Sequence, residues 1–327
     1  MTEIDYSVVI RTLGTAGEKY RKLLQSIDQL EPQPKEVIVV LPEGYDFPNE
    51  QLGYERFCFS KKGMIAQRMH GLNECKSELA LFCDDDVEFG KDFVKYLYEP
   101  IKQGKAEISV GPLLSFLVPR GIKTVASILS AGSYPTVFHK DKYITMLRSG
   151  AWSYNRNLNF EDNVFYPTDS AAWTCFFGSV EAMKRIHFLD ESWIEKYNYA
   201  ALDDQVMFYK AKLRGIRTVV ASKAYYIHND AKTSQSGIRK DSVFAGTYNR
   251  VVFWHRFIYK MQKNILNRAL TRLAWTYRCI SGNAYTHLCF WGGKVDKERL
   301  FINKQAYKAA WEYIRSNEYK ELPEVLE

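Results

Sequence analysis

Residues 79–86 read Leu-Ala-Leu-Phe-Cys-Asp-Asp-Asp, and this stretch decides how the rest of the chain is interpreted. The apolar run over 79–83 predicts a strand buried on both faces, because it is short and shows no polar alternation. Three carboxylates follow at the carboxyl end of that strand. Successive side chains of an extended chain point to opposite sides, so we expect Asp84 and Asp86 to point one way and Asp85 the other.

Three adjacent carboxylates repel one another unless a cation shares them. Their oxygen ligands suit Mg²⁺ or Mn²⁺, ions that proteins usually hold with a few carboxylates and the phosphates of a substrate. The triplet therefore indicates a site for a divalent ion and a phosphate-bearing ligand. A solvated acidic turn after the strand is the alternative, and a three-residue motif by itself leaves both open.

The 327 residues suit one large α/β domain with an appendage, or two domains. With 46% hydrophobic and 25% charged residues, the chain is globular rather than disordered. The six cysteines form no CxxC pair, which is typical of reduced thiols. We expect neither a secretory signal nor a membrane span, since no apolar run approaches the roughly 20 residues that a bilayer requires. The expected location is the cytoplasm, with peripheral attachment to the inner face of the membrane as an open alternative.

Strands and helices are predicted to alternate along the first two thirds of the chain. The strands are expected at 6–11, 36–41, 54–59, 79–83, 106–110, 171–177 and 218–222, and the helices at 17–30, 63–75, 91–102, 180–186 and 201–214. This order predicts an α/β fold with a Rossmann-like, mainly parallel sheet and helices on both faces. Ligands of such sheets gather at the carboxyl ends of the strands, where the acidic triplet lies. Residues 119–170 are interpreted as an elaborated loop region with one or two helices.

The last third of the chain differs in character. Residues 250–278 have helical spacing, and between 239 and 278 nine Lys and Arg stand against one Asp. Such a basic, aromatic helix suits either a solvated face packed on the preceding domain or docking on an anionic membrane surface. Nucleic-acid binding would use similar charge, but no recognised binding module is present. We predict one domain over 1–240, in two parts over 1–110 and 111–240, followed by a helical region over 241–327.

Further polar residues are candidates for the same site as the triplet. Arg68 lies on the helix before the acidic strand, Asp203 and Asp204 open a later helix where carboxylates are favoured, and His228 follows the last strand. Each has a simpler interpretation: a surface arginine, a helix cap and a structural histidine. Trp173 suits sugar stacking or plain core packing.

The ordered set of motifs resembles the family 2 glycosyltransferases, which have the GT-A fold. The resemblance covers about residues 5–230, and the triplet looks like the family's DXD motif. The matching segments are Ser7–Thr12, Glu36–Leu41, the helix with Gly63, Arg68 and Gly71, Leu81–Asp86, and Ala172–Gly215.

The resemblance implies that a sugar is moved from a nucleotide sugar, with a UDP-sugar favoured, to a hydroxyl of a saccharide acceptor. A lipid-linked glycan is included among the acceptors, and the transfer would invert the anomeric centre with help from Mn²⁺ or Mg²⁺. The implied roles are base or ribose contact for Thr12, nucleotide binding for Arg68, ribose contact for Asp84, metal binding for Asp86 and His228, and catalytic base for Asp204.

The chain also departs from the family pattern. Arg11-Thr12-Leu13-Gly14 replaces the usual Pro-Thr-Tyr/Phe-Asn, and Leu41-Pro42 stands where members have an acid pair. Glu43 is the nearest carboxylate there, and it joins Asp85 as a further candidate on the nucleotide side. Asp203-Asp204 replaces the usual Glu-Asp, so either residue can be the base, with Asp204 favoured. Two rival functions are a nucleotidyltransferase and a non-catalytic, membrane-associated binding protein.

Overall fold

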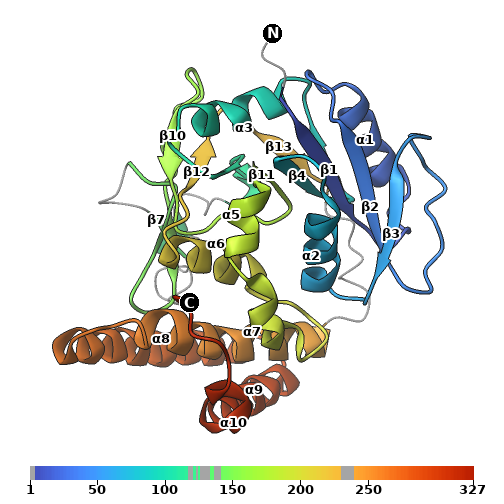
Figure 1. Cartoon of the computed structure of the whole chain (residues 1–327). Helices are drawn as coiled ribbons and strands as arrows, with labels where there is room; N and C mark the ends of the chain where they lie inside the picture. The colour runs from blue at the N-terminus through green and yellow to red at the C-terminus, as the bar shows by residue number, and fades with distance from the viewer. Residues whose placement is uncertain (1–3, 117–120, 123, 126–132, 136–140, 230–238) are drawn as a thin grey trace.

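An eight-stranded sheet forms the centre of the molecule (Figure 1). The computed structural model describes residues 4–116, 121–122, 124–125, 133–135, 141–229 and 239–327. The strand order is β10-β12-β6-β11-β4-β1-β2-β3. These strands are β1 Tyr6–Arg11, β2 Glu36–Pro42, β3 Arg56–Ser60, β4 Leu79–Asp84, β6 Ile108–Val110, β10 Phe165–Pro167, β11 Cys175–Ser179 and β12 Thr218–Ala221.

Most neighbouring strands of this sheet run parallel. The four strands β4, β1, β2 and β3 pair in parallel, as do β6 and β12. Strand β11 is antiparallel to both β4 and β6, and β10 is antiparallel to β12. The predicted α/β class with a mainly parallel sheet is therefore confirmed.

Helices cover both faces of the sheet, as predicted. Along β1, Val8 and Ile10 join one core cluster and Val9 joins the other, because alternate side chains of a strand point to opposite faces. Helices α1 (Glu18–Asp28) and α3 (Phe93–Lys102) pack on the first face. Helices α2 (Met64–Glu74), α5 (Val180–Arg185) and α6 (Asp203–Leu213) pack on the second face.

Two smaller sheets flank the central one. Strands β5 (Val87–Phe89) and β13 (Tyr226–His228) form an antiparallel pair. Strands β7 (Ser133–Pro135), β9 (Trp152–Tyr154) and β8 (Ile144–Met146) form a three-stranded sheet. The prediction of a loop region over 119–170 is thus wrong where the structure describes it, because strands this short lack a readable alternation. Short 3₁₀ turns occur at Leu114–Phe116 and Phe188–Glu195.

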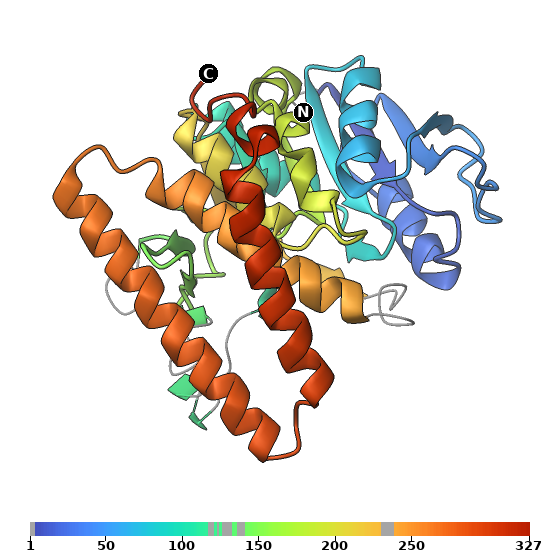
Figure 2. The same cartoon turned by 90° about the horizontal axis from the view of Figure 1, so that it is seen from below.

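The C-terminal region is helical, as predicted, but residues 250–278 are not one helix. The chain runs through α7 (Arg239–Phe253), a π-helical turn (Trp254–Tyr259), α8 (Ile265–Trp291), α9 (Lys297–Arg315) and α10 (Asn317–Lys320). Helix α8 begins afresh because the Asn264 side chain caps it by accepting from the Asn267 N–H. Figure 2 shows α8 and α9 meeting at one end and diverging towards the rest of the molecule.

The basic residues of this region are not all on a solvated face. Arg256 is 2% exposed and donates to both carboxylate oxygens of Glu191, at 2.8 and 3.0 Å. Lys210 of α6 lies 2.8 Å from the same carboxylate. Burial raises the pKa of Glu191, but hydrogen bonds and charge from Arg256 and Lys210 outweigh it and leave that pKa below its usual value. Sequence periodicity cannot reveal such a pairing across 65 residues.

The C-terminal helices share a core with the sheet. Tyr248 and Phe253 of α7 and Ala310 of α9 belong to the same buried cluster as Val9 of β1. Among the helices of the described residues, none combines the length and the apolar character needed to cross a bilayer.

We predict that Glu191→Gln lowers the free energy of unfolding by about 3–5 kcal/mol, because it leaves the buried cations Lys210 and Arg256 without their shared carboxylate. Urea unfolding of the two proteins measures the difference. The matched control is Glu298→Gln, which removes an exposed pair with Lys240 and is expected to leave stability unchanged within error. Equal losses in the two variants would contradict a structural role for the buried network.

Candidate active site

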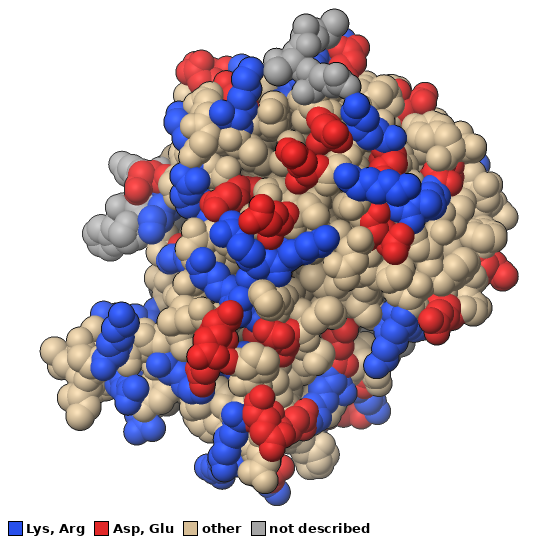
Figure 3. All heavy atoms as spheres, in the orientation of Figure 1, with Lys and Arg blue, Asp and Glu red and all other residues tan. Residues whose placement is uncertain are grey.

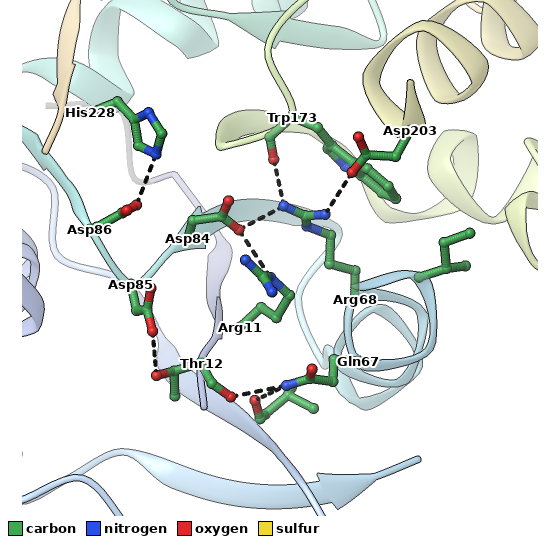
Figure 4. Close-up of polar contacts among 12 residues, drawn as sticks. Arg11, Thr12, Gln67, Arg68, Asp84, Asp85, Asp86, Trp173, Asp203 and His228 are labelled. Atoms are coloured by element: carbon green, nitrogen blue, oxygen red, sulfur yellow. Dashed lines mark hydrogen bonds and ion pairs between the residues drawn. The ribbon is translucent and has the colours of Figure 1, made fainter. Parts of the chain in front are cut away.

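The acidic triplet lies beside the end of β1 because β1 and β4 are parallel neighbours. Their register pairs Arg11 with Asp84, so the residues after both strands reach the same edge of the sheet. Asp84 is buried, and its Oδ1 accepts from Arg11 Nε at 3.2 Å and from Arg68 Nη2 at 2.6 Å (Figure 4). Burial by itself lowers the pKa of Arg11, but Asp84 and Asp85 raise it above the ordinary arginine value.

Arg68 joins the strand side of this site to the region before α6. It is 2% exposed, so it is not a surface residue of α2. Besides Asp84, its guanidinium donates to the Trp173 carbonyl at 3.1 Å, and Nη1 lies 3.6 Å from Asp203 Oδ2. The guanidinium also stacks over the Trp173 ring at 4.1 Å.

Trp173 is a core residue. The predicted strand over 171–177 begins only at Cys175, and Trp173 lies in the turn before it. The indole is 1% exposed and packs edge-on against Phe188. Of the two interpretations open from the sequence, the structure therefore favours packing over sugar stacking.

The three carboxylates of the triplet have three different partners. Thr12 Oγ1 donates to Asp85 Oδ2 at 2.6 Å, and Asp86 Oδ1 lies 3.1 Å from His228 Nε2. The strand alternation on which the expected sides of Asp84 and Asp86 were based does not extend past Asp84, because β4 ends there and the next two residues form a turn. Burial raises the pKa of Asp85 to about 6, against the opposing effects of Arg11 and the Thr12 hydrogen bond.

His228 reaches Asp86 through strand pairing. In the β5–β13 pair, His228 is the register partner of Val87, the residue after Asp86, and the Asn229 N–H donates to the Asp86 carbonyl at 2.8 Å. Two ligands of one octahedral ion bound at about 2.0–2.1 Å lie about 3 Å apart, so this pair fits two places around a Mg²⁺-like ion. In the described part of the chain, no three His, Cys, Asp or Glu side chains gather around one such place.

Helix α2 holds the side chains of Gln67 and Arg68 against the sheet edge. Gln67 is buried and its Nε2 donates to the carbonyls of Thr12 and Val40, so it ties the ends of β1 and β2 together. Gly71 allows the close approach, since a Cβ there would lie 2.4 Å from Val9 Cγ1.

Asp203 and Asp204 begin α6. The Trp173 N–H donates to Asp204 Oδ1 at 2.8 Å, and Asp204 lines a cavity of about 170 Å³ together with Tyr143, Trp152 and Tyr154. Burial raises the pKa of Asp203 to about 6, although Arg68 opposes the shift. Burial first, and then the charge of Asp203, raise the pKa of Asp204 well above its usual range. These carboxylates are held by specific partners in a desolvated site rather than serving only as a helix cap.

The structure thus gathers most of the candidate residues. Arg68 contacts both Asp84 and Asp203, while Thr12–Asp85 and Asp86–His228 form separate pairs nearby. Glu43 is exposed on the turn after β2 and is not part of these contacts among the described residues.

The sequence analysis missed two members of this site, Arg11 and Gln67. Arg11 is the last residue of a predicted strand, and its position at the carboxyl end of that strand could have indicated a place near the acidic triplet. Gln67 carries no signal, because the two carbonyls that it binds depend on the tertiary structure.

Residues 54–164 match the sequence model of glycosyl transferase family 2, about a third of the chain. This part of the chain is similar to that family. Comparison of the sequence with curated proteins gave no match. The match supports a glycosyltransferase, and it favours this activity over the two rival functions.

Solved structures show the same fold. Residues 1–349 of S. aureus TarS align over 94% of this glycosyltransferase and 81% of that chain, with a TM-score of 0.50 and 16% identity. The complex of TarS with UDP-GlcNAc gives 0.49 and 14% identity over 94% and 80% of the two chains. GalNAc-T7 with UDP, GalNAc and Mn²⁺ gives 0.47 and 13% identity over 85% and 55%. The likeness to TarS bears out the predicted GT-A fold.

We predict that Gly71→Ala destabilises the glycosyltransferase by about 1–3 kcal/mol, because the new methyl group forces α2 away from β1 and β2. The control is Gly246→Ala in α7, where nothing lies within 4 Å of the added Cβ and helix propensity predicts a gain of about 0.5–1 kcal/mol. Denaturant unfolding measures both. A stabilising Gly71→Ala would show that the approach of α2 is not tight.

Proposed function

We propose that this glycosyltransferase moves a sugar from a nucleotide sugar to a hydroxyl of a saccharide acceptor, with inversion and with help from Mn²⁺ or Mg²⁺. The observation that carries the proposal is the double contact of Arg68 with Asp84 and Asp203. The Arg68 guanidinium contacts one member of the acidic triplet, which is suited to a diphosphate and its ion. It also contacts one member of the Asp203–Asp204 pair, which is suited to base catalysis. A UDP-sugar is the donor to test first.

On the donor side, the geometry favours roles for Asp84 and Thr12 at the nucleotide and a positioning role for Arg68. Arg68 is buried and already engaged by Asp84 and the Trp173 carbonyl, so it acts on the donor through the carboxylate that it orients. Asp85 accepts a hydrogen bond from Thr12, so its proposed role is to orient Thr12 rather than to contact the nucleotide. The exposed Glu43 is left as a peripheral contact of the nucleotide.

Asp86 and His228 would hold the divalent ion, and the donor phosphates would supply further ligands. Such an ion, when bound, stabilises the negative charge of the leaving diphosphate. The protein's own contribution is to fix the two ligands through the β5–β13 pairing.

Asp204 is proposed as the catalytic base. Its pKa is raised above the ordinary aspartate value, which makes the ionised group a stronger proton acceptor, and the Trp173 N–H donates to one of its oxygens. The acceptor oxygen forms the bond to the anomeric carbon, the bond from that carbon to the diphosphate oxygen breaks, and Asp204 takes the hydroxyl proton. One displacement from the face opposite the leaving group inverts the anomeric carbon.

We further propose peripheral contact with the inner face of the membrane through α8, and keep residue 240 as the boundary of the catalytic region. Helix α8 contains three Arg and no acidic residue. Figure 3 shows Lys and Arg among uncharged side chains where α8 projects at the lower left. Its large apolar side chains that are more than half exposed are Ile265, Leu266, Leu273, Tyr277, Ile280, Leu288 and Trp291.

The two carboxylates of α6 are expected to behave differently in a transfer assay. Asp204→Asn should lower the transfer rate about 10²–10⁴-fold, because the proton acceptor is lost, while UDP binding stays within twofold. Asp203→Asn should remain active. The transfer rate of this variant is expected to rise with pH as Asp204 loses its proton. Removal of the Asp203 charge lowers the pKa of Asp204, so this rise should occur at lower pH than in the unaltered enzyme. Loss of transfer with Asp203→Asn and retention with Asp204→Asn would reassign the base.

Removal of divalent ions with EDTA is expected to abolish transfer, and added Mn²⁺ should restore it. Asp86→Asn should need more Mn²⁺ for half-maximal rate, whereas Glu88→Gln on strand β5 should match the unaltered enzyme. Full activity in EDTA would refute the metal role.

A further inference from the structure

A large cleft is lined by residues of α7, α8 and α9 and by Trp152, and none of the three aspartates of the triplet lines it. Its volume is about 1350 Å³, which exceeds the roughly 300–1,000 Å³ of most small-molecule pockets. The helices α8 and α9 contact each other little beyond the turn that joins them, so the cleft separates them along most of their length.

The charged residues that line this cleft are all basic. Arg250, Arg278, Lys297 and Lys304 contribute to its wall, and no Asp or Glu among the described residues does so. Surface basic residues elsewhere in the protein commonly have acidic partners, such as Lys240 with Glu298. The lining therefore favours an anionic ligand.

Arg250 lies at the inner wall of the cleft. Its Nε is buried and has no hydrogen-bond partner among the described residues. Burial lowers the pKa of Arg250, and no carboxylate offsets the effect. A buried guanidinium nitrogen without a hydrogen-bond partner is costly, so an anion bound at this side chain would relieve that penalty.

The rest of the lining is mainly apolar and aromatic. It includes Trp275, Ile280, Phe301 and Tyr307. Ile280 and Phe301 are also more than half exposed, so the cleft opens onto the apolar outer surface of α8 and α9. A ligand with an anionic head and a long apolar tail matches both parts of the wall, whereas a free anion would use only one.

The cleft also adjoins the proposed acceptor side of the active site. Trp152 of β9 lines both the cleft and the 170 Å³ cavity that contains Asp204. The cleft and the cavity that contains the proposed base are therefore neighbours, with Trp152 in the wall of both.

We propose that the α8–α9 cleft binds a phosphate-bearing lipid, the anchor of a lipid-linked acceptor whose sugar end reaches towards Asp204. The acceptor role rests on the proposed function; the binding site itself does not. A second copy of the chain fits less well, because pairing the same surface would bring basic side chains of the two copies together.

The test is equilibrium binding of dodecyl phosphate, below its micelle concentration, followed by tryptophan fluorescence. Dodecyl phosphate should bind at least tenfold more tightly than inorganic phosphate or uncharged dodecyl maltoside. Arg250→Gln should weaken binding at least tenfold, while Arg268→Gln, exposed on α8 outside the cleft, should leave it unchanged. Ala284→Trp fills the cleft at an exposed position and should abolish binding without loss of thermal stability.

Equal binding of the maltoside, or equal effects of the two arginine variants, would overturn the proposal. So would a concentration-dependent dimer that Ala284→Trp disrupts in sedimentation, which would assign the cleft to a second copy. UDP binding is measured on the same samples: if UDP binds and dodecyl phosphate does not, the cleft proposal alone fails. If dodecyl phosphate binds and transfer from nucleotide sugars is absent, the proposed function alone fails.

Discussion

The buried contact between Arg68 and Asp84 is the constraint on which the site depends. Two charges removed from water are tolerated only when each has further partners, and here Arg11, the Trp173 carbonyl and ring, and Asp203 supply them. These partners come from β1, the turn before β11, and α6. One guanidinium therefore links the strand end that carries the acidic triplet to the start of α6.

A second buried ionic group also joins segments that are far apart in the sequence. Glu191, Lys210 and Arg256 come from the 3₁₀ segment, α6 and the π-helical turn, and they join the C-terminal helices to the catalytic region. Helix α6 takes part in both groups, since Asp203 lies at its start and Lys210 two turns later. The position of the proposed base is thus coupled to the packing of the C-terminal region as well as to the sheet.

The sequence predicted much of the sheet and the location of the triplet, because buried strands leave continuous apolar runs. It failed where partners are set by register or by distant segments. Asp84 and Asp86 have different partners, Asp86 lies in the turn that follows β4, and its contact with His228 depends on the pairing of β5 with β13. Likewise, helical spacing over 250–278 could not separate Arg256, which is buried against Glu191, from the exposed arginines of α8. Periodicity shows that a face is apolar, but it does not show what covers that face.

Trp152 has a thermodynamic consequence of its own. Because this side chain forms part of the wall of two cavities, any ligand that moves it in one cavity changes the shape of the other. The resulting coupling free energy is the same in both directions, so occupancy of either cavity alters affinity at the other by one common factor. The indole thereby makes two neighbouring sites parts of one linked equilibrium.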